Sequence, residues 1–151
     1  MKKQYKFKSK KIYFIGAVDF NGKNIGGEKI KNQNFVRYLE IKGLEKIIID
    51  TTNWRKRFLP ISLRILNLLI KKQDDKIFLS CADPGAYKFL KLSRFLNIYE
   101  KEIYYFVIGG ILVEKIKDNK GSLKVYNKCT KIYAESKIMV NRLRSLGLEQ
   151  S

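Results

Sequence analysis

The sequence contains no histidine, and only two cysteines and two prolines among its 151 residues. Without histidine the chain supplies no imidazole base, which excludes mechanisms that depend on one within this chain. Cys81 and Cys129 lie far apart and form no CxxC pair, and a zinc site would need more ligands than these. We therefore expect two reduced thiols in the core of a cytosolic protein.

Acidic residues are also scarce, because 14 aspartates and glutamates stand against 32 lysines and arginines, a net charge of +18. This charge favours anionic partners such as phosphate groups, nucleic acid or acidic lipid headgroups. A solvated lysine surface that reflects a biased composition explains the charge equally well. The hydrophobic content of 45% is that of a globular protein, and the length allows one domain with a core.

No apolar stretch is long enough to form a membrane-spanning helix. The basic N-terminal segment, residues 1–11, is followed by an apolar run at residues 12–18 that is too short to span and has no convincing cleavage site. We therefore expect a cytoplasmic protein whose contacts with the inner face of the cell membrane are peripheral.

Short β-branched or aromatic runs alternate with longer helical patterns along the chain. Strands are expected at residues 12–18, 46–50, 77–80, 103–108 and 131–134. Helices are expected at residues 28–42, 58–72, 83–97 and 136–146, and residues 111–129 favour a short helix and a turn at Gly121-Ser122. This alternation predicts an α/β fold over residues 12–151: a Rossmann-like, open, mostly parallel sheet with helices on both faces.

Three helix boundaries have clear residue signals. Gly43 suits the position just after a helix, and Ser136 is a typical N-cap. Asp83 is expected to cap the third helix, with Pro84 at its first helical position.

Ligands of such sheets bind beyond the carboxyl ends of the strands, and three aspartates fall there. Asp19 is the best catalytic candidate by its position, whereas Asp50 is more simply a turn residue and Asp83 a helix cap. An alternative is that the three carboxylates gather around Mg²⁺, as in a metal-dependent nuclease or phosphotransferase.

Two glycine-containing loops also fall at this edge. The first loop, with Gly22, Gly26 and Gly27, leads into a helix N-terminus, where the backbone can approach an anion closely. It matches neither the Walker A nor the G-x-G-x-x-G pattern, so a plain strand-to-helix turn explains it as well. Gly109-Gly110, directly after a strand, would permit a sharp turn into the cleft.

The second predicted helix is strongly apolar and has basic flanks. A helix of this kind can lie in a membrane interface or pack on the sheet. If it meets a membrane, the residues expected to face the lipid headgroups are Arg55, Lys56, Arg57, Arg64, Lys71 and Lys72.

Taken together, these segments resemble the N-terminal domain of GT-B glycosyltransferases of the family 4 (group 1) type, especially those of bacterial capsular and exopolysaccharide synthesis. The resemblance spans nearly the whole chain from Ile12 and depends on the order and spacing of the segments. The matching segments are Gly26-Gly27 with Lys31-Asn32, Asp50-Thr51, residues 78–80 with Asp83-Pro84-Gly85, and residues 104–110, 131–136, 139–140 and 143–148.

This resemblance implies transfer of a sugar from a nucleotide donor to an acceptor hydroxyl, often on a lipid-linked saccharide at an anionic membrane surface. Gly26 and Gly27 would then approach the donor phosphates. The acceptor cleft would hold Asp83, Gly109, Gly110 and Glu135. No metal or cofactor is implied besides the nucleotide-sugar, which acts as a co-substrate.

The sequence departs from this family in two ways. The C-terminal donor domain with its E-x₇-E-type motif is absent, so the resemblance implies a separate donor-domain polypeptide or a truncated gene product, inactive alone. Many relatives also have a histidine where this chain has Gly109-Gly110. A basic nucleic-acid-binding module is a further alternative, but the aromatic residues lie mostly in predicted strands and no RNP-like motif occurs, so nucleic acid is not the expected partner.

Overall fold

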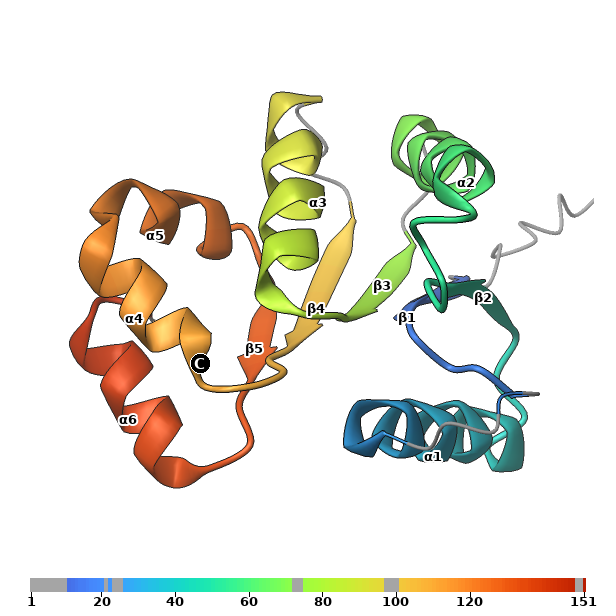
Figure 1. The fold of residues 1–151 in the computed structure, drawn as a ribbon, viewed down its shortest axis with the longest axis horizontal. Coiled ribbons are helices and arrows are strands. Elements are labelled where there is room, and N and C mark those ends of the chain that lie inside the picture. Colours follow the sequence, from blue (N-terminus) through green and yellow to red (C-terminus); the bar gives the residue numbers. More distant parts are fainter. Residues whose placement is uncertain (1–10, 21, 23–25, 72–74, 97–100, 149–150) are drawn as a thin grey trace, which may run out of the picture.

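The computed structural model describes residues 11–20, 22, 26–71, 75–96, 101–148 and 151, which form alternating strands and helices (Figure 1). The strands are β1 (Ile12–Gly16), β2 (Lys46–Asp50), β3 (Lys76–Ser80), β4 (Glu102–Phe106) and β5 (Lys131–Tyr133). The helices are α1 (Gly27–Ile41), α2 (Phe58–Ile70), α3 (Asp83–Phe95), α4 (Ile111–Asp118), α5 (Lys120–Tyr126) and α6 (Lys137–Ser145).

The strands form one sheet in the order β2-β1-β3-β4-β5, and every neighbouring pair is parallel. Phe14 in β1 pairs with Ile48 on one side and Phe78 on the other. The predicted α/β, Rossmann-like fold is therefore confirmed. The chain leaves β1 toward β2 on one side and later returns to β3 on the other, so β1 and β3 flank the point where the strand order reverses.

Helices cover both faces of the sheet. Figure 1 shows α1 on one side and α2 and α3 on the other. Because side chains alternate along a strand, Tyr13 and Ile15 join the larger core with α2 and α3, whereas Phe14 joins a smaller core with Val36 of α1. Helix α6 packs beside α4, and its Leu143 belongs to the larger core.

The α1 side of the sheet carries a row of aromatic rings. Phe35 of α1 lies 5.1 Å from the rings of both Phe78 and Phe106. Further along this row, Tyr104 stacks on Phe78, and Tyr133 stacks on Phe106 while leaving 40% of its surface exposed.

Most of the predicted boundaries agree with the structure. Gly43 and Gly147 follow α1 and α6 with φ values of +64° and +92°, and the Ser136 side chain caps α6 by accepting a hydrogen bond from the Met139 amide at 3.2 Å. The expected turn at Gly121-Ser122 is wrong, since both residues lie in the first turn of α5, where the Asn119 side chain accepts a hydrogen bond from the Gly121 amide.

The predicted cap at Asp83 is also wrong. Ala82 occupies the N-cap, Asp83 is the first residue of α3, and its carboxylate makes no cap hydrogen bond. The expected ends of two helices, Lys72 and Asn97, lie outside the described residues.

Both cysteines are free thiols, as expected. Cys129 is buried in the larger core and Cys81 packs against it. Burial raises the pKa of each thiol to about 12, which makes both poor nucleophiles. Among the described residues, no helix combines the length and the apolar character that crossing a bilayer requires.

Candidate functional site

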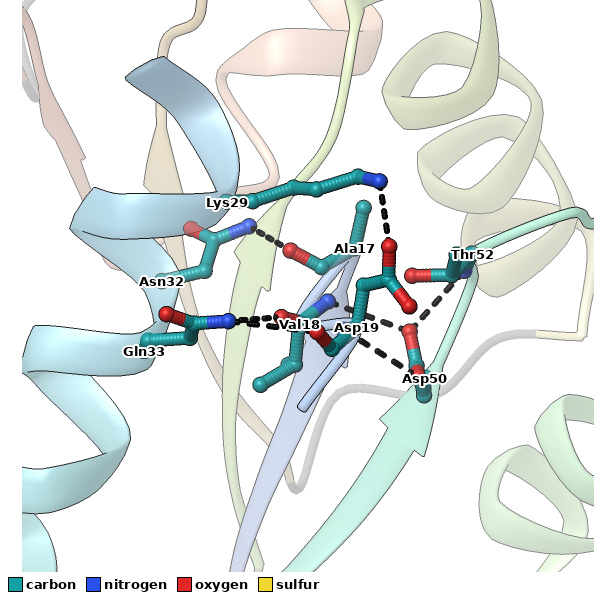
Figure 2. Close-up of polar contacts among 8 residues, drawn as sticks. All are labelled: Ala17, Val18, Asp19, Lys29, Asn32, Gln33, Asp50 and Thr52. Carbon is teal, nitrogen blue, oxygen red and sulfur yellow. Dashed lines mark hydrogen bonds and ion pairs between the residues drawn. The ribbon is translucent and has the colours of Figure 1, made fainter. Parts of the chain in front are cut away.

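The segment after β1 is held by hydrogen bonds to Asp50 at the end of β2 (Figure 2). The Asp50 carboxylate accepts from the backbone amides of Val18 at 3.1 Å, Asp19 at 3.4 Å and Thr52 at 2.9 Å. Burial alone would raise the pKa of Asp50, but these bonds favour the charged form and outweigh it, so the pKa is lowered. Asp50 thus connects the carboxyl ends of β1 and β2.

Asp19 is held in a constrained position in the same loop. Its backbone has a φ of +46°, and its carboxylate forms an ion pair with Lys29 of α1 at 2.5 Å. A Cβ added at Gly22 would overlap the Asp19 carboxylate, so the loop passes directly over it. The carboxylate of the expected catalytic residue therefore faces Lys29 and the loop backbone.

Helix α1 is fastened to the same strand ends by two amide side chains (Figure 2). The Asn32 amide donates to the Ala17 carbonyl at 2.9 Å, and its oxygen accepts from the Ser80 hydroxyl at 2.6 Å. Gln33 donates to the Val18 carbonyl at 2.8 Å. These bonds fix the first turns of α1 above the carboxyl ends of β1 and β3.

A cavity of about 390 Å³ opens between α1 and the carboxyl ends of the strands. Its lining comes from β1, α1, β3 and the ends of β4 and β5, and consists of Phe14, Lys31, Asn32, Phe35, Ser80, Phe106, Val107, Ile108, Tyr133, Ala134 and Glu135. Aromatic rings form much of the wall, and Asn32 and Ser80 are buried polar groups. This is the position at which open parallel sheets bind ligands.

An ion pair bridges the rim of this cavity. The Lys31 ammonium on α1 contacts the Glu135 carboxylate in the loop after β5, and both side chains are exposed. Exposed pairs of this kind contribute little to stability, so both groups can exchange their partner for a ligand.

Residues predicted for one cleft lie in different places. Glu135 lines the cavity, whereas Gly110 borders a smaller cavity of about 180 Å³ between α4 and α6. Gly109, with a φ of +78°, makes the turn between β4 and α4. Gly26 is the N-cap of α1 and Gly27 its first residue, and a Cβ added at either glycine would meet none of the described residues within 4 Å.

Asp83 lies apart from these residues, in the larger core on the opposite face. The Tyr126 hydroxyl donates to its carboxylate, and Lys115 of α4 forms an ion pair with it. Burial and the hydrogen bond to Asp83 raise the pKa of Tyr126. The α3 N-terminus is covered by α4 and α5, and this is why Asp83 does not line the cavity on the α1 side.

The alternative of a magnesium site is not supported. Asp19, Asp50 and Asp83 each have different partners, and no three histidine, cysteine, aspartate or glutamate side chains of the described residues gather closely enough to hold a metal ion. Asp19 and Asp50 lie next to each other (Figure 2), whereas Asp83 lies on the opposite face of the sheet, against Tyr126.

The basic residues around α2 are exposed, as membrane-facing residues would be. Arg55, Lys56 and Arg57 precede the helix, Arg64 lies on it and Lys71 follows it, whereas Lys72 lies outside the described residues. The helix also packs on the sheet, because Ile61, Leu68 and Leu69 are buried.

Sequence reasoning missed most of the cavity lining. Phe106 and Tyr133 were expected to be core residues of strands, since periodicity does not reveal where α1 stops covering the sheet. Asn32 could have been found, because it occupies the apolar stripe of α1 with Val36 and Leu39.

No protein-family model matches this chain, and no curated protein matches it significantly in sequence.

Proposed function

We propose that this chain is the acceptor-side half of a glycosyltransferase that moves a sugar from a nucleotide-sugar to a saccharide acceptor. The observation that carries the proposal is the cavity beside α1, with aromatic walls, buried polar groups and a charged rim. It lies at the strand ends next to the point where the strand order reverses, the usual ligand position of this fold.

The cavity lining suits a sugar ring. Sugars present apolar C–H faces, which pack on aromatic rings, and hydroxyl groups, which need hydrogen-bond partners at the edges. Phe106 and Tyr133 offer stacked rings at the wall, and Lys31 and Glu135 offer a donor and an acceptor at the rim. The volume suits the end of an acceptor saccharide rather than a long polymer.

The start of α1 supports the second part of the proposal, the approach of donor phosphates. Among the residues that the structure describes, none fills the space beside Gly26 and Gly27 at the helix N-terminus, and the N-cap Gly26 has no side chain to cap it. Free backbone N–H groups and the helix dipole favour an anion there. In this proposal the residues of this chain hold the acceptor, and a donor domain holds the nucleotide.

Saccharide binding to the cavity is the first prediction. Adding acceptor-type oligosaccharides to the labelled chain should shift the amide NMR signals of Lys31, Ser80 and Glu135. Tyr133→Ala should weaken binding about threefold to tenfold, because a stacking ring contributes about 0.5–1.5 kcal/mol beyond its buried area.

The matched control is Tyr38→Ala, which removes another exposed tyrosine from the outer surface of α1. It should leave the affinity unchanged. Shifts confined to other surfaces, or an equal loss in both variants, would contradict the proposal. A donor domain can be co-expressed to measure sugar transfer. If Tyr133→Ala slows the transfer and Tyr38→Ala does not, the proposal extends from binding to catalysis.

A further inference from the structure

Helix α2 has two apolar faces, only one of which is packed in the described structure. Ile61, Leu68 and Leu69 are buried on the sheet. A second stripe remains in solvent: Leu59, Leu63, Leu66 and Ile70 are 67%, 57%, 38% and 63% exposed. Their spacing of four, three and four residues places them along one line of the helix surface.

Two exposed aromatic side chains lie at the amino end of the helix, Trp54 in the preceding turn and Phe58 as the first helical residue. Trp54 and Phe58 are both exposed, and their ring centroids lie 6.2 Å apart. A surface helix with one contact face is normally polar on the other side, and a continuous exposed apolar patch marks an interaction site. We call these residues, Trp54, Phe58, Leu59, Leu63, Leu66 and Ile70, the α2 stripe.

The charged residues within the α2 segment all have one sign. The segment from Thr51 to Lys71 contains five basic residues, Arg55, Lys56, Arg57, Arg64 and Lys71, and no aspartate or glutamate. Each of the five is exposed, and none forms an ion pair with a described acidic residue. The stripe therefore lies between cations that an anionic surface would neutralise.

We propose that α2 docks this protein on an anionic lipid bilayer, with the α2 stripe at the acyl boundary and the flanking cations among the headgroups. An amphipathic helix lying in the interface needs an apolar face, aromatic side chains near the headgroup level and lysine or arginine beside it. The α2 surface has all three.

Charge complementarity selects the bilayer over other occupants. A second copy of the chain docked through the same stripe would bring five cations of one copy against five of the other. A nucleic acid would pair with the cations but leave the leucines and isoleucine in water. An anionic bilayer satisfies both parts of the surface.

The orientation keeps the proposed acceptor cavity accessible. Figure 1 shows α2 and α1 on opposite sides of the sheet, and the cavity lies on the α1 side. Docking through α2 leaves that side open. The proposed docking does not depend on sugar transfer, since it would hold even if the cavity bound no saccharide.

Vesicle binding of the full chain tests the proposal. In flotation, the chain should bind phosphatidylcholine vesicles containing phosphatidylglycerol at least about tenfold more tightly than vesicles of phosphatidylcholine alone, and added salt should weaken the binding. The triple variant Leu59→Gln, Leu63→Gln, Ile70→Gln should lose about tenfold or more in affinity. Ile41→Gln with Ile138→Gln, which changes exposed residues of α1 and α6, should bind normally.

A second pair of variants separates the local cations from the overall charge. Each variant removes three positive charges, and all the replaced residues are exposed. The test variant is Arg55→Gln, Lys56→Gln, Arg57→Gln, and the control is Lys117→Gln, Lys124→Gln, Lys137→Gln. The test variant should bind the anionic vesicles at least about tenfold more weakly than the control.

Three results would overturn the proposal. The first is equal binding to both kinds of vesicle. The second is unchanged vesicle binding by the triple leucine and isoleucine variant, after circular dichroism has shown that this variant is folded. The third is self-association, seen in sedimentation velocity and abolished by the same variant, without any vesicle binding. That result would assign the stripe to a second copy of the chain.

Discussion

The strand-end aspartates are equivalent in sequence but differ in chemical state. Asp50 accepts three backbone hydrogen bonds, Asp19 forms an ion pair with Lys29, and Asp83 is buried against Tyr126 and Lys115. Hydrogen bonds and neighbouring charges determine the pKa of a carboxyl group, so its role depends on its neighbours. Here Asp50 and Asp19 hold the loop after β1, whereas Asp83 lies against Tyr126 of the larger core, on the opposite face of the sheet.

Asp50 should make the fold sensitive to acid. Its pKa is lowered in the folded protein from the ordinary value of 3.8, so its stabilising contribution is complete above that value and is lost as the pH falls through the folded pKa. Asp50→Asn should reduce the free energy of unfolding at pH 7 by about 1–3 kcal/mol, because bonds to a charged acceptor are lost. It should also flatten the pH dependence below about pH 4.

Urea unfolding at several pH values from neutral to acidic measures both effects. Glu40→Gln is the control, because this exposed glutamate forms an ion pair only at the surface, with Lys46. An acid dependence as steep in Asp50→Asn as in the parent chain would show that another group is responsible.

The two apolar sides of helix α2 have different environments. Leucine and isoleucine occur all round α2, yet the structure divides them into the buried side with Leu68 and the exposed α2 stripe with Leu63. A helix that is apolar on most sides is expected to be buried, unless its outer face meets another apolar phase. The energetic contribution of each leucine should therefore depend on its side of the helix.

Leu68→Ala should lower the free energy of unfolding by about 2–5 kcal/mol, since it leaves a cavity between α2 and the sheet. Leu63→Ala should change it by less than about 0.5 kcal/mol, because its side chain is already in water. Denaturant unfolding of the two variants, which carry the same replacement, compares them directly. Similar losses at both positions would mean that the outer face of α2 is also packed in solution.

At the scale of the whole molecule, the chain carries a net charge of +18 on 151 residues. The described ion pairs, such as Lys46–Glu40, use the few carboxylates, and most of the cations remain exposed. These cations repel one another, which destabilises the compact folded state, and salt screens the repulsion.

Stability should therefore rise with ionic strength. Going from about 0.01 M to about 0.15 M sodium chloride shortens the Debye length from about 30 Å to about 8 Å, so the thermal midpoint should increase. Differential scanning fluorimetry measures it. Reversing two exposed charges with Lys117→Glu and Lys124→Glu should reduce the salt effect, and a midpoint that falls with salt in the parent chain would contradict this view.

Hydrophobic periodicity predicted the fold class and nearly every strand and helix, because burial on both faces of a parallel sheet imposes continuous apolar runs locally. It failed where boundaries depend on single contacts. The first turn of α5 forms because the Asn119 side chain caps it, and Asp83 does not cap α3 because Tyr126 and Lys115 engage its carboxylate.

The sequence by itself determined the α/β architecture, the edge where ligands would bind and the basic, apolar character of α2. Only the tertiary structure decided which side chains share a site. Glu135 meets Lys31 from 104 residues away, the aromatic row is left partly uncovered by α1, and one face of α2 remains in solvent. The physical reason is that local patterns encode which residues avoid water. Packing between elements that are distant in the sequence decides which other residues each of them contacts.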